Sequence, residues 1–218
     1  MLGVLMLATS FRRPVGDIGN PLTFPFPVLY ETVPKASVHR VVKEPDRLLI
    51  NEFVAAGRLL ERRGAKAIST SCGFLALFQS EIQAQLSVPF AASSLLQVPE
   101  AERRHGQVGV LTARRASLTG AHFLGAGCRG LPAAVAGMDT SPAFTSAIVE
   151  GTADLDEQAV EREVAEVASS LLREHRGLGA IVLECTNLPP YAAMVREVSG
   201  LPVYDSTTLC LDLLKAAP

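Results

Sequence analysis

Two stretches of this chain follow one pattern, and that pattern decides the fold. Residues 66–94 are KAISTSCGFLALFQSEIQAQLSVPFAASS, and residues 179–207 are GAIVLECTNLPPYAAMVREVSGLPVYDST. Each stretch starts an apolar segment with Ala-Ile, has a cysteine five residues after that alanine, and has a proline 17 residues after the cysteine. A serine follows each proline at the same distance. The two cysteines, Cys72 and Cys185, therefore occupy equivalent positions of a repeat.

The repeat extends upstream of these stretches. Gly3-Val4-Leu5 matches Gly109-Val110-Leu111 at a separation of 106 residues, and the two cysteines are separated by 113 residues. Because all these matches occur in the same order, the chain is predicted to consist of two copies of one α/β unit. We assign residues 1–97 and 205–218 to the first lobe and residues 98–204 to the second.

Short apolar runs alternate with longer helical patterns, which is typical of parallel sheets covered by helices. The expected strands are Gly3–Leu7, Val38–Val42, Ala67–Thr70, Val88–Ala91, Val108–Thr112, Ala133–Ala136, Ala180–Leu183 and Leu201–Tyr204. The expected helices are Arg47–Arg63, Leu75–Leu86, Ser117–Leu124, Glu157–His175, Pro190–Ser199 and Ser206–Ala216. The predicted fold class is α/β, with two pseudo-symmetric flavodoxin-like lobes. Each lobe has a parallel sheet flanked by helices, and the active site lies in the cleft between the lobes.

One segment breaks this alternation. Arg13–Lys35 contains five prolines and two glycines, which predicts an irregular loop. A loop of this length in a compact domain is usually functional, so we expect a lid or a contact between two copies in a homodimer. A simple surface excursion is an equally good interpretation of the same segment.

Composition excludes several classes of protein. The 218 residues carry a formal net charge of −2, which gives no indication of a nucleic-acid or membrane surface. No apolar run is long enough to cross a bilayer, and the opening MLGVLMLA is interpreted as a buried strand rather than a signal peptide. We therefore expect a cytoplasmic protein with reduced thiols. The cysteines and histidines show no zinc-ligand spacing, so no metal site is predicted.

Both repeat cysteines fall where a strand ends and a helix begins, which is where open α/β sheets bind ligands. A helix N-terminus also favours the thiolate form of a cysteine. A lone cysteine is more often a buried core residue, but two at equivalent positions favour function. Lobes that face each other would put one thiol on each side of a bound carbon, as proton removal and return on opposite faces requires.

Three segments resemble one known family. TSCGF (residues 70–74) and LECTNLPPY (residues 183–191) are similar to the two cysteine motifs of the aspartate/glutamate/hydantoin racemase superfamily. GVLMLATSFRRPVGDIGNP (residues 3–21) resembles an uncharacterised branch of it, and the two-lobed organisation agrees over most of the chain. The resemblance implies an isomerase that uses neither pyridoxal phosphate nor a metal. It would be a racemase or epimerase that inverts Cα of an amino acid or an amino-acid derivative.

The resemblance also implies roles for individual residues. Cys72 and Cys185 would be the acid–base pair, one removing the Cα proton and the other returning one. Backbone amides and small polar side chains after the strands would hold the carboxylate of a small-molecule substrate. The residues predicted to bind substrate are Thr9, Ser10, Gly73, Thr112, Thr186 and Asn187.

The chain departs from the family pattern at three places. Gly73-Phe74 stands where glutamate racemases have Asn-Thr, Asn187 stands where the family has His or Glu, and Ala8 stands where an acidic residue is usual. These departures weaken the case for glutamate or aspartate as the substrate. Alternatives are therefore a related cysteine-dependent enzyme, similar to maleate isomerase or arylmalonate decarboxylase, or an inactive protein that binds a small molecule.

Four other features carry less weight. GAGCRG (residues 125–130) matches a dinucleotide-binding motif in letters only, because no strand precedes it. Cys128 and Cys210 have no partner in the repeat and are interpreted as structural. Glu184 precedes the second cysteine and is expected to point away from the thiol. Arg12 and Arg13 could bind a second carboxylate, although a solvated pair is favoured.

Overall fold

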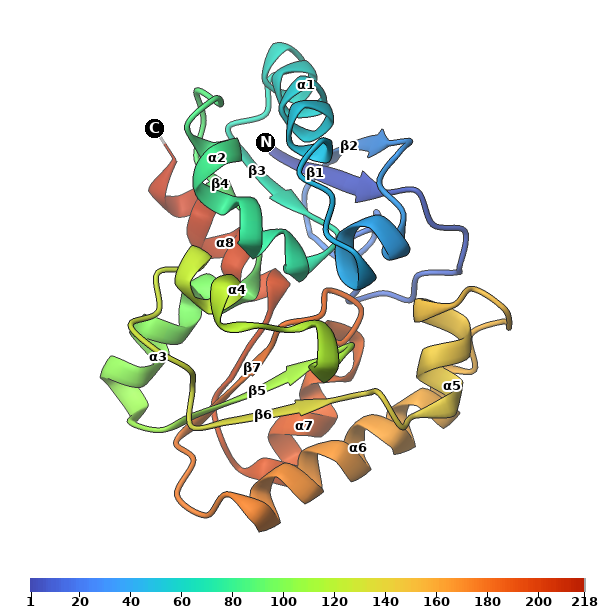
Figure 1. Ribbon diagram of the computed structural model, residues 1–218, viewed down its shortest axis with the longest axis vertical. Coiled ribbons are helices and arrows are strands. Elements are labelled where there is room, and N and C mark those ends of the chain that lie inside the picture. The colour runs from blue at the N-terminus through green and yellow to red at the C-terminus, as the bar shows by residue number, and fades with distance from the viewer. Residues whose placement is uncertain (218) are drawn as a thin grey trace.

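The computed structural model describes residues 1–217 and contains two four-stranded sheets, one in each lobe (Figure 1). The strand order is β2-β1-β3-β4 in the first sheet and β6-β5-β7-β8 in the second. The strands are β1 (Leu2–Leu7), β2 (Val28–Val33), β3 (Ala67–Thr70), β4 (Phe90–Ala91), β5 (Val108–Thr112), β6 (Ala134–Gly137), β7 (Ala180–Leu183) and β8 (Val203–Tyr204). Neighbouring strands pair in parallel in both sheets, so the predicted two-lobed α/β architecture is confirmed.

The repeat in the sequence is also a repeat of backbone hydrogen bonds. The amide of Ile68 donates to the carbonyl of Pro89 at 2.9 Å, and the amide of Ile181 donates to the carbonyl of Pro202 at the same distance. These bonds align β3 with β4 and β7 with β8. Because β3 and β7 hold the same place in their sheets, the two repeat cysteines leave the sheets at equivalent points.

The helices connect the strands and cover the sheets. The α-helices are α1 (Leu49–Arg62), α2 (Gln79–Gln83), α3 (Val98–His105), α4 (Gly120–Gly125), α5 (Pro142–Phe144), α6 (Glu157–Glu174), α7 (Ala192–Ser199) and α8 (Ser206–Ala216). Short helical turns are η1 (His39–Lys43), η2 (Gly73–Phe78), η3 (Ser94–Gln97), η4 (Arg115–Ser117), η5 (Thr145–Val149) and η6 (Pro189–Tyr191). In the first lobe α1 packs on β1 and β2, and in the second α6 packs on β6 and α7 (Figure 1).

The last helix returns to the first sheet. Helix α8 packs against β3 and β4, and its buried Cys210 joins Leu2, Val4, Ile18 and Phe24 in a small apolar cluster. The helix starts where the side chain of Asp205 accepts backbone amides at 2.9 Å, which is a standard helix N-cap. The division of the chain after residues 97 and 204 stays a prediction, and residue 218 lies outside the described residues.

One predicted strand is wrong. Residues Val38–Val42 lie largely in η1, a π-helical turn, and the strand beside β1 is β2. Val41 and Val42 are the buried residues of this turn. A run of five residues with mixed polarity cannot distinguish a half-buried strand from a short helical turn, because both bury apolar side chains.

The proline-rich segment Arg13–Lys35 is irregular only in its first part. Its second part forms β2, so the expectation of an irregular loop over the whole segment is wrong. The first part folds onto the second lobe at Gly16, whose φ is +105°, and a Cβ there would lie 2.8 Å from Cα of Pro190. Only glycine fits this backbone conformation and this close approach. The segment therefore connects the two lobes at the carboxyl ends of the strands.

Candidate active site

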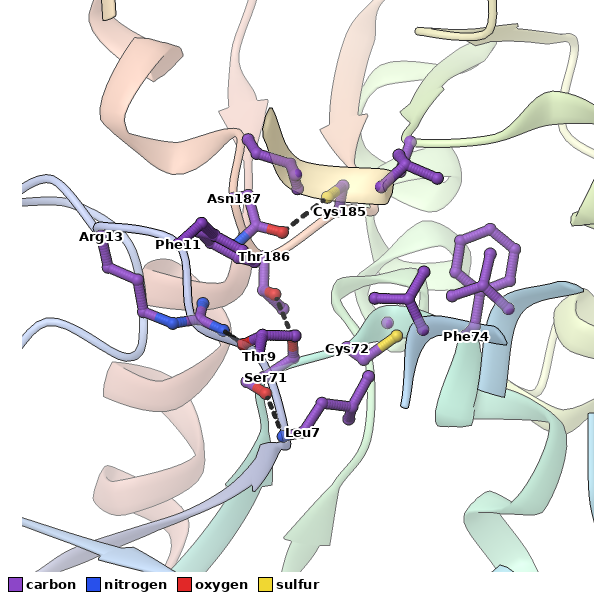
Figure 2. A pocket seen from close by; sticks show the side chains of 16 residues that line it. Leu7, Thr9, Phe11, Arg13, Ser71, Cys72, Phe74, Cys185, Thr186 and Asn187 are labelled. Atoms are coloured by element: carbon purple, nitrogen blue, oxygen red, sulfur yellow. Dashed lines mark hydrogen bonds between the residues drawn. The ribbon is translucent and has the colours of Figure 1, made fainter. Parts of the chain in front are cut away.

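Both predicted catalytic cysteines line one pocket between the lobes (Figure 2). Cys72 comes from the first lobe, two residues after the end of β3, and Cys185 comes from the second lobe, two residues after the end of β7. The space between atoms at this pocket amounts to about 450 Å³, a volume that includes open solvent. The structure therefore brings the two thiols together at one cavity, as the repeat predicts, and their catalytic role stays a prediction.

Cys72 is the N-cap residue of η2, with an extended backbone at φ −153°. Burial raises the pKa of its thiol to about 12, and the carboxyl of Glu184 contributes to this rise. The amide of Phe74 and the guanidinium of Arg13 lower it. The sequence predicts a thiolate favoured by the helix terminus, but here desolvation is the larger effect. The resting thiol is therefore protonated, and its thiolate would be a strong base.

Cys185 has a more polar neighbour than Cys72. Its Sγ donates to Oδ1 of Asn187 at 3.5 Å. Burial raises the pKa of this thiol well above its ordinary value, and Glu184 raises it further, while the backbone amide of Asn187 lowers it. The two thiols thus share a protonated resting state but differ in what surrounds them.

A largely buried arginine forms one wall of the pocket. Nη2 of Arg13 donates to Oγ1 of Thr9 at 2.8 Å, and its Nη1 lies 2.9 Å from Oδ1 of Asp17. The guanidinium also lies 4.4 Å from the ring centre of Phe11. Only 11% of the Arg13 side chain is exposed, whereas Arg12 is exposed and pairs with Glu157 on the surface. The expected solvated pair is therefore correct for Arg12 and wrong for Arg13.

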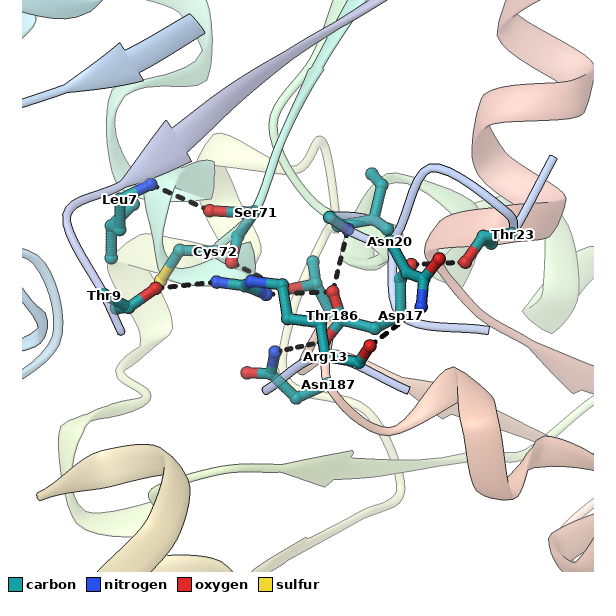
Figure 3. Close-up of polar contacts among 12 residues, drawn as sticks. Leu7, Thr9, Arg13, Asp17, Asn20, Thr23, Ser71, Cys72, Thr186 and Asn187 are labelled. Atoms are coloured by element: carbon teal, nitrogen blue, oxygen red, sulfur yellow. Dashed lines mark hydrogen bonds and ion pairs between the residues drawn. The ribbon is translucent and has the colours of Figure 1, made fainter. Parts of the chain in front are cut away.

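Asp17 links this arginine to the second cysteine, and no pattern in the sequence singles it out. Nδ2 of Asn187 donates to Oδ2 of Asp17 at 2.6 Å, and the amide of Gly19 donates to Oδ1 at 2.7 Å. Asp17 is fully buried although it lies in the proline-rich segment (Figure 3). A continuous set of contacts therefore runs from Thr9 through Arg13, Asp17 and Asn187 to Cys185.

The other predicted substrate-binding residues fall into two groups. Thr9, Gly73, Thr186 and Asn187 line the pocket with the cysteines. Ser10 is exposed and lies in a wider outer cleft, and Thr112 is fully buried with its hydroxyl donating to Oε2 of Glu184 at 2.6 Å. Substrate contact by any of these six residues stays a prediction.

The far side of the pocket is apolar. Its lining residues come from η1 and the residue before it, from η5 and from the start of η2, and they are Val38, Val42, Phe74, Ile148 and Val149. The ring of Phe74 packs edge-on against His122, with ring centres 5.4 Å apart. Among the 16 lining residues, all within the described chain, Arg13 is the one with a charged side chain. The pocket therefore has a cationic polar end and an apolar end.

Residues 1–217 contain neither a candidate metal cluster nor a candidate membrane-spanning helix. Within them no three His, Cys, Asp or Glu side chains gather closely enough to hold a metal ion. No helix in the same residues combines the length and the apolar character needed to cross a bilayer.

Comparison with known proteins identifies the family. Residues 51–214 match the Asp/Glu/Hydantoin racemase model, and the chain therefore belongs to this family. It is 31% identical over 215 residues to dimethylsulfoniopropionate lyase of Durusdinium sp. clade D, covering 94% of this chain and 71% of that protein. It is 29% identical over 227 residues to dimethylsulfoniopropionate lyase 3 of Emiliania huxleyi (strain CCMP1516), covering 98% and 58%.

The chain is shorter than these curated relatives, since it spans 58–71% of their length. Among solved structures it resembles a mutant of arylmalonate decarboxylase in the sulfate ion associated form. The TM-score is 0.66 at 18% identity, over 98% of this chain and 92% of the other. At this level of identity the likeness shows the fold alone. The racemase name of the family and the lyase names of the curated relatives make this an enzyme family with more than one type of reaction.

Proposed function

We propose that this chain is a lyase that removes a proton from the carbon next to a carboxylate and then eliminates a leaving group from the adjacent carbon. Its proposed substrate is a small sulfonium carboxylate of the dimethylsulfoniopropionate type. The observation that carries the proposal is the pocket itself, which two cysteines and a largely buried arginine line together and in which none of the described lining residues is acidic. The names of the most similar curated relatives support the choice of leaving group.

The polar end of the pocket suits a carboxylate. Arg13 has five N–H donors and uses two of its nitrogens on Thr9 and Asp17, so others are available to a bound anion. Guanidinium pairs well with carboxylate, and a partly buried pair is stronger than one in water. Holding the carboxylate next to Arg13 also stabilises the negative charge that develops there when the adjacent carbon loses its proton.

The reaction needs one thiolate as its base. The thiolate takes the proton from Cα, the electrons of that C–H bond form the new double bond, and the bond from Cβ to sulfur breaks with its electron pair leaving on dimethyl sulfide. The products are acrylate, dimethyl sulfide and a protonated thiol, which returns its proton to solvent. A single base in contact with the substrate is sufficient for this balance.

The apolar end of the pocket suits a methylated cation better than an ammonium group. An ammonium group needs several hydrogen-bond acceptors, whereas a dimethylsulfonium group has no N–H to satisfy. The ring of Phe74, which lines this end, can contact such a cation through its face. The buried carboxylate of Asp17 already accepts from Arg13, Gly19 and Asn187, so it is not free for an ammonium group.

An amino-acid racemase or epimerase is the second candidate. The observation that favours it is the second cysteine, because elimination needs one base and inversion of a stereocentre needs two on opposite sides. Both cysteines line the pocket and come from opposite lobes (Figure 2). The two candidates share the first step, removal of a proton next to a carboxylate, and differ in the second step, which is loss of a leaving group or return of a proton.

The test measures both outcomes on one preparation. Purified protein is incubated with dimethylsulfoniopropionate and dimethyl sulfide is followed by gas chromatography, while a panel of amino acids in heavy water is examined by NMR for deuterium at Cα. Dimethyl sulfide release without amino-acid exchange supports the lyase. Exchange or racemisation without release overturns it in favour of the racemase. The same assays are run on Cys72→Ala and Cys185→Ala. Cys128→Ala is their matched control, because Cys128 is buried outside the pocket.

A further inference from the structure

A buried carboxyl lies at the junction of the two lobes and has no role in the proposed elimination. Glu184 directly follows β7, is fully buried and does not line the pocket. It reaches the first lobe at Gly73, where a Cβ would lie 2.3 Å from Oε1 of Glu184. Gly73 is the residue next to Cys72, and Glu184 is the residue next to Cys185. One carboxyl from the second lobe is thus adjacent to both cysteine segments.

The hydrogen bonding of this carboxyl is incomplete. Oε2 accepts from the hydroxyl of Thr112 at 2.6 Å, and the backbone amide of Ala113 also lowers the pKa of the carboxyl. Oε1 is buried and has no partner in the described residues. An ionised carboxylate with an unpaired buried oxygen is costly, and a protonated one is less so. Burial accordingly raises the pKa of Glu184 to about 7.

Charge on this carboxyl acts on both thiols. After burial itself, Glu184 is the largest influence that raises the pKa of each cysteine. The other charged groups that act on them are Arg13, which lowers the pKa of Cys72, and both Asp17 and Cys72, which raise the pKa of Cys185. Two negative charges in one buried cluster repel each other strongly, because little water screens them. Ionised Glu184 and a thiolate therefore disfavour each other.

We propose that Glu184 is a positioning residue whose protonation permits either cysteine to become a thiolate, so that Cys72, Glu184 and Cys185 together hold one negative charge at a time. In the proposed function the thiolate is the catalytic base, and the inference rests on the proposed function for that role alone. It adds a group outside the pocket that controls when the base forms. The two lobes are coupled through this group, since it acts on a thiol from each.

Thiol alkylation tests this without any substrate. Iodoacetamide is added to wild type and Glu184→Gln between pH 6 and 9, and the rate at Cys72 is followed by peptide mass spectrometry. Glutamine keeps the size and the acceptor for Thr112 but cannot ionise. The ratio of the variant rate to the wild-type rate should be near one at pH 6. It should rise to about tenfold by pH 9, because a nearby like charge shifts a pKa by about one unit or more.

Two further variants keep the test decisive. Glu174→Gln changes an exposed glutamate at the end of α6, and its alkylation ratio should stay near one at every pH. Thr112→Val removes the hydroxyl that favours the ionised carboxylate, so it should raise the pKa of Glu184. Ionised Glu184 should then begin to slow the alkylation of Cys72 at a higher pH in this variant than in wild type. It also serves if Glu184→Gln does not fold.

The outcomes separate this inference from the proposed function. A flat ratio for Glu184→Gln across the pH range overturns the inference, as does an unchanged profile in Thr112→Val if that is the variant that folds. A rising ratio in a protein that releases no dimethyl sulfide supports the inference while the lyase proposal fails. Release of dimethyl sulfide with a flat ratio does the reverse.

Discussion

The two cysteines have the same backbone position and different neighbours. Each follows a central strand of its sheet, yet the residue two positions later is Phe74 in the first lobe and Asn187 in the second. Cys72 therefore faces an apolar wall, whereas Cys185 donates to an amide that is fixed by Asp17. Duplication of a fold places two thiols at one cavity, and single substitutions beside them then make the two thiols unequal.

The inequality comes largely from one segment. The first part of the proline-rich segment supplies both Arg13 and Asp17, and it crosses from the first lobe to contact Pro190 in the second. Arg13 acts on Cys72, while Asp17 acts on Cys185 through Asn187. Figure 3 shows these side chains in one connected set. A segment that looks irregular in the sequence thus carries the charges of the site.

The largest expected effect is on the cysteines. Elimination uses one base, so one of Cys72→Ala and Cys185→Ala should lose about 10³-fold in the rate of dimethyl sulfide release, and the other should lose about tenfold or less. Initial rates at saturating dimethylsulfoniopropionate measure this. Equal losses of about 10³-fold in both variants would show that both thiols act in turnover, which is what racemisation requires.

Arg13 should have the next largest effect. Arg13→Met removes the cation that holds the carboxylate and leaves Asp17 without its ion pair, so kcat/KM should fall by about 10²-fold, mostly through KM. Arg12→Met is the matched control, because Arg12 is exposed and pairs with a surface glutamate. It should change kcat/KM by less than about twofold. Similar losses in the two variants would mean that Arg13 does not hold the substrate.

Arg13→Lys completes this comparison. Lysine keeps the positive charge but lacks the planar fork that contacts Thr9 and Asp17 together. It should recover about tenfold of the loss in Arg13→Met while remaining below wild type. A lysine variant no better than methionine would show that positive charge without the planar fork does not hold the substrate. Circular dichroism of each variant checks that the loss is not caused by unfolding.

The repeat in the sequence predicts only those features of the structure that are themselves repeated in the two lobes. The alignment of the two cysteine segments predicts β3, β7 and their shared pocket, because equivalent backbone positions impose equivalent geometry. It could not predict the contact between Asp17 and Asn187, which joins residues 170 positions apart and has no counterpart in the repeat. Arg13 and Arg12 are indistinguishable as adjacent letters, and only the path of the segment buries one of them.

Local signals in the sequence also mark two elements that the alternation of strands and helices misses. β2 is a strand of Val, Tyr and Thr residues typical of sheets, but the prolines before it favour an irregular interpretation. Helix α3 (VPEAERRH) has proline and Glu100 in its first turn and Arg103 in its last, which is the order that suits a helix. Val98 and Ala101 are its buried residues, and two apolar positions are too few to predict a helix from periodicity.

The contact between the segment and the second lobe can be broken at one atom. Gly16→Ala should lower the free energy of unfolding by about 3 kcal/mol, since a positive φ costs about 1–2 kcal/mol and the new Cβ also meets Pro190. Gly64→Ala is the control, because its φ is also positive at +93° and nothing lies within 4 Å of the new Cβ. It should cost about 1 kcal/mol. Urea denaturation measures both, and equal costs would mean that the segment yields freely at Pro190.

The smallest expected effect concerns the residue two positions after each cysteine, where the two lobes differ. If Phe74 contacts a sulfonium group through its ring face, Phe74→Leu should raise KM for dimethylsulfoniopropionate about threefold to tenfold with little change in kcat. Phe74→Tyr keeps the ring and should stay within about twofold of wild type.

The cation is the source of the effect, so an inhibitor of the same shape without charge should bind Phe74→Leu and wild type with similar affinity. If the neutral inhibitor weakens as much as the sulfonium substrate does, Phe74 contributes shape rather than charge recognition. In that case the first lobe's apolar wall fits a bulky substituent of any kind, and the asymmetry between the cysteines concerns the size of the substrate more than its charge.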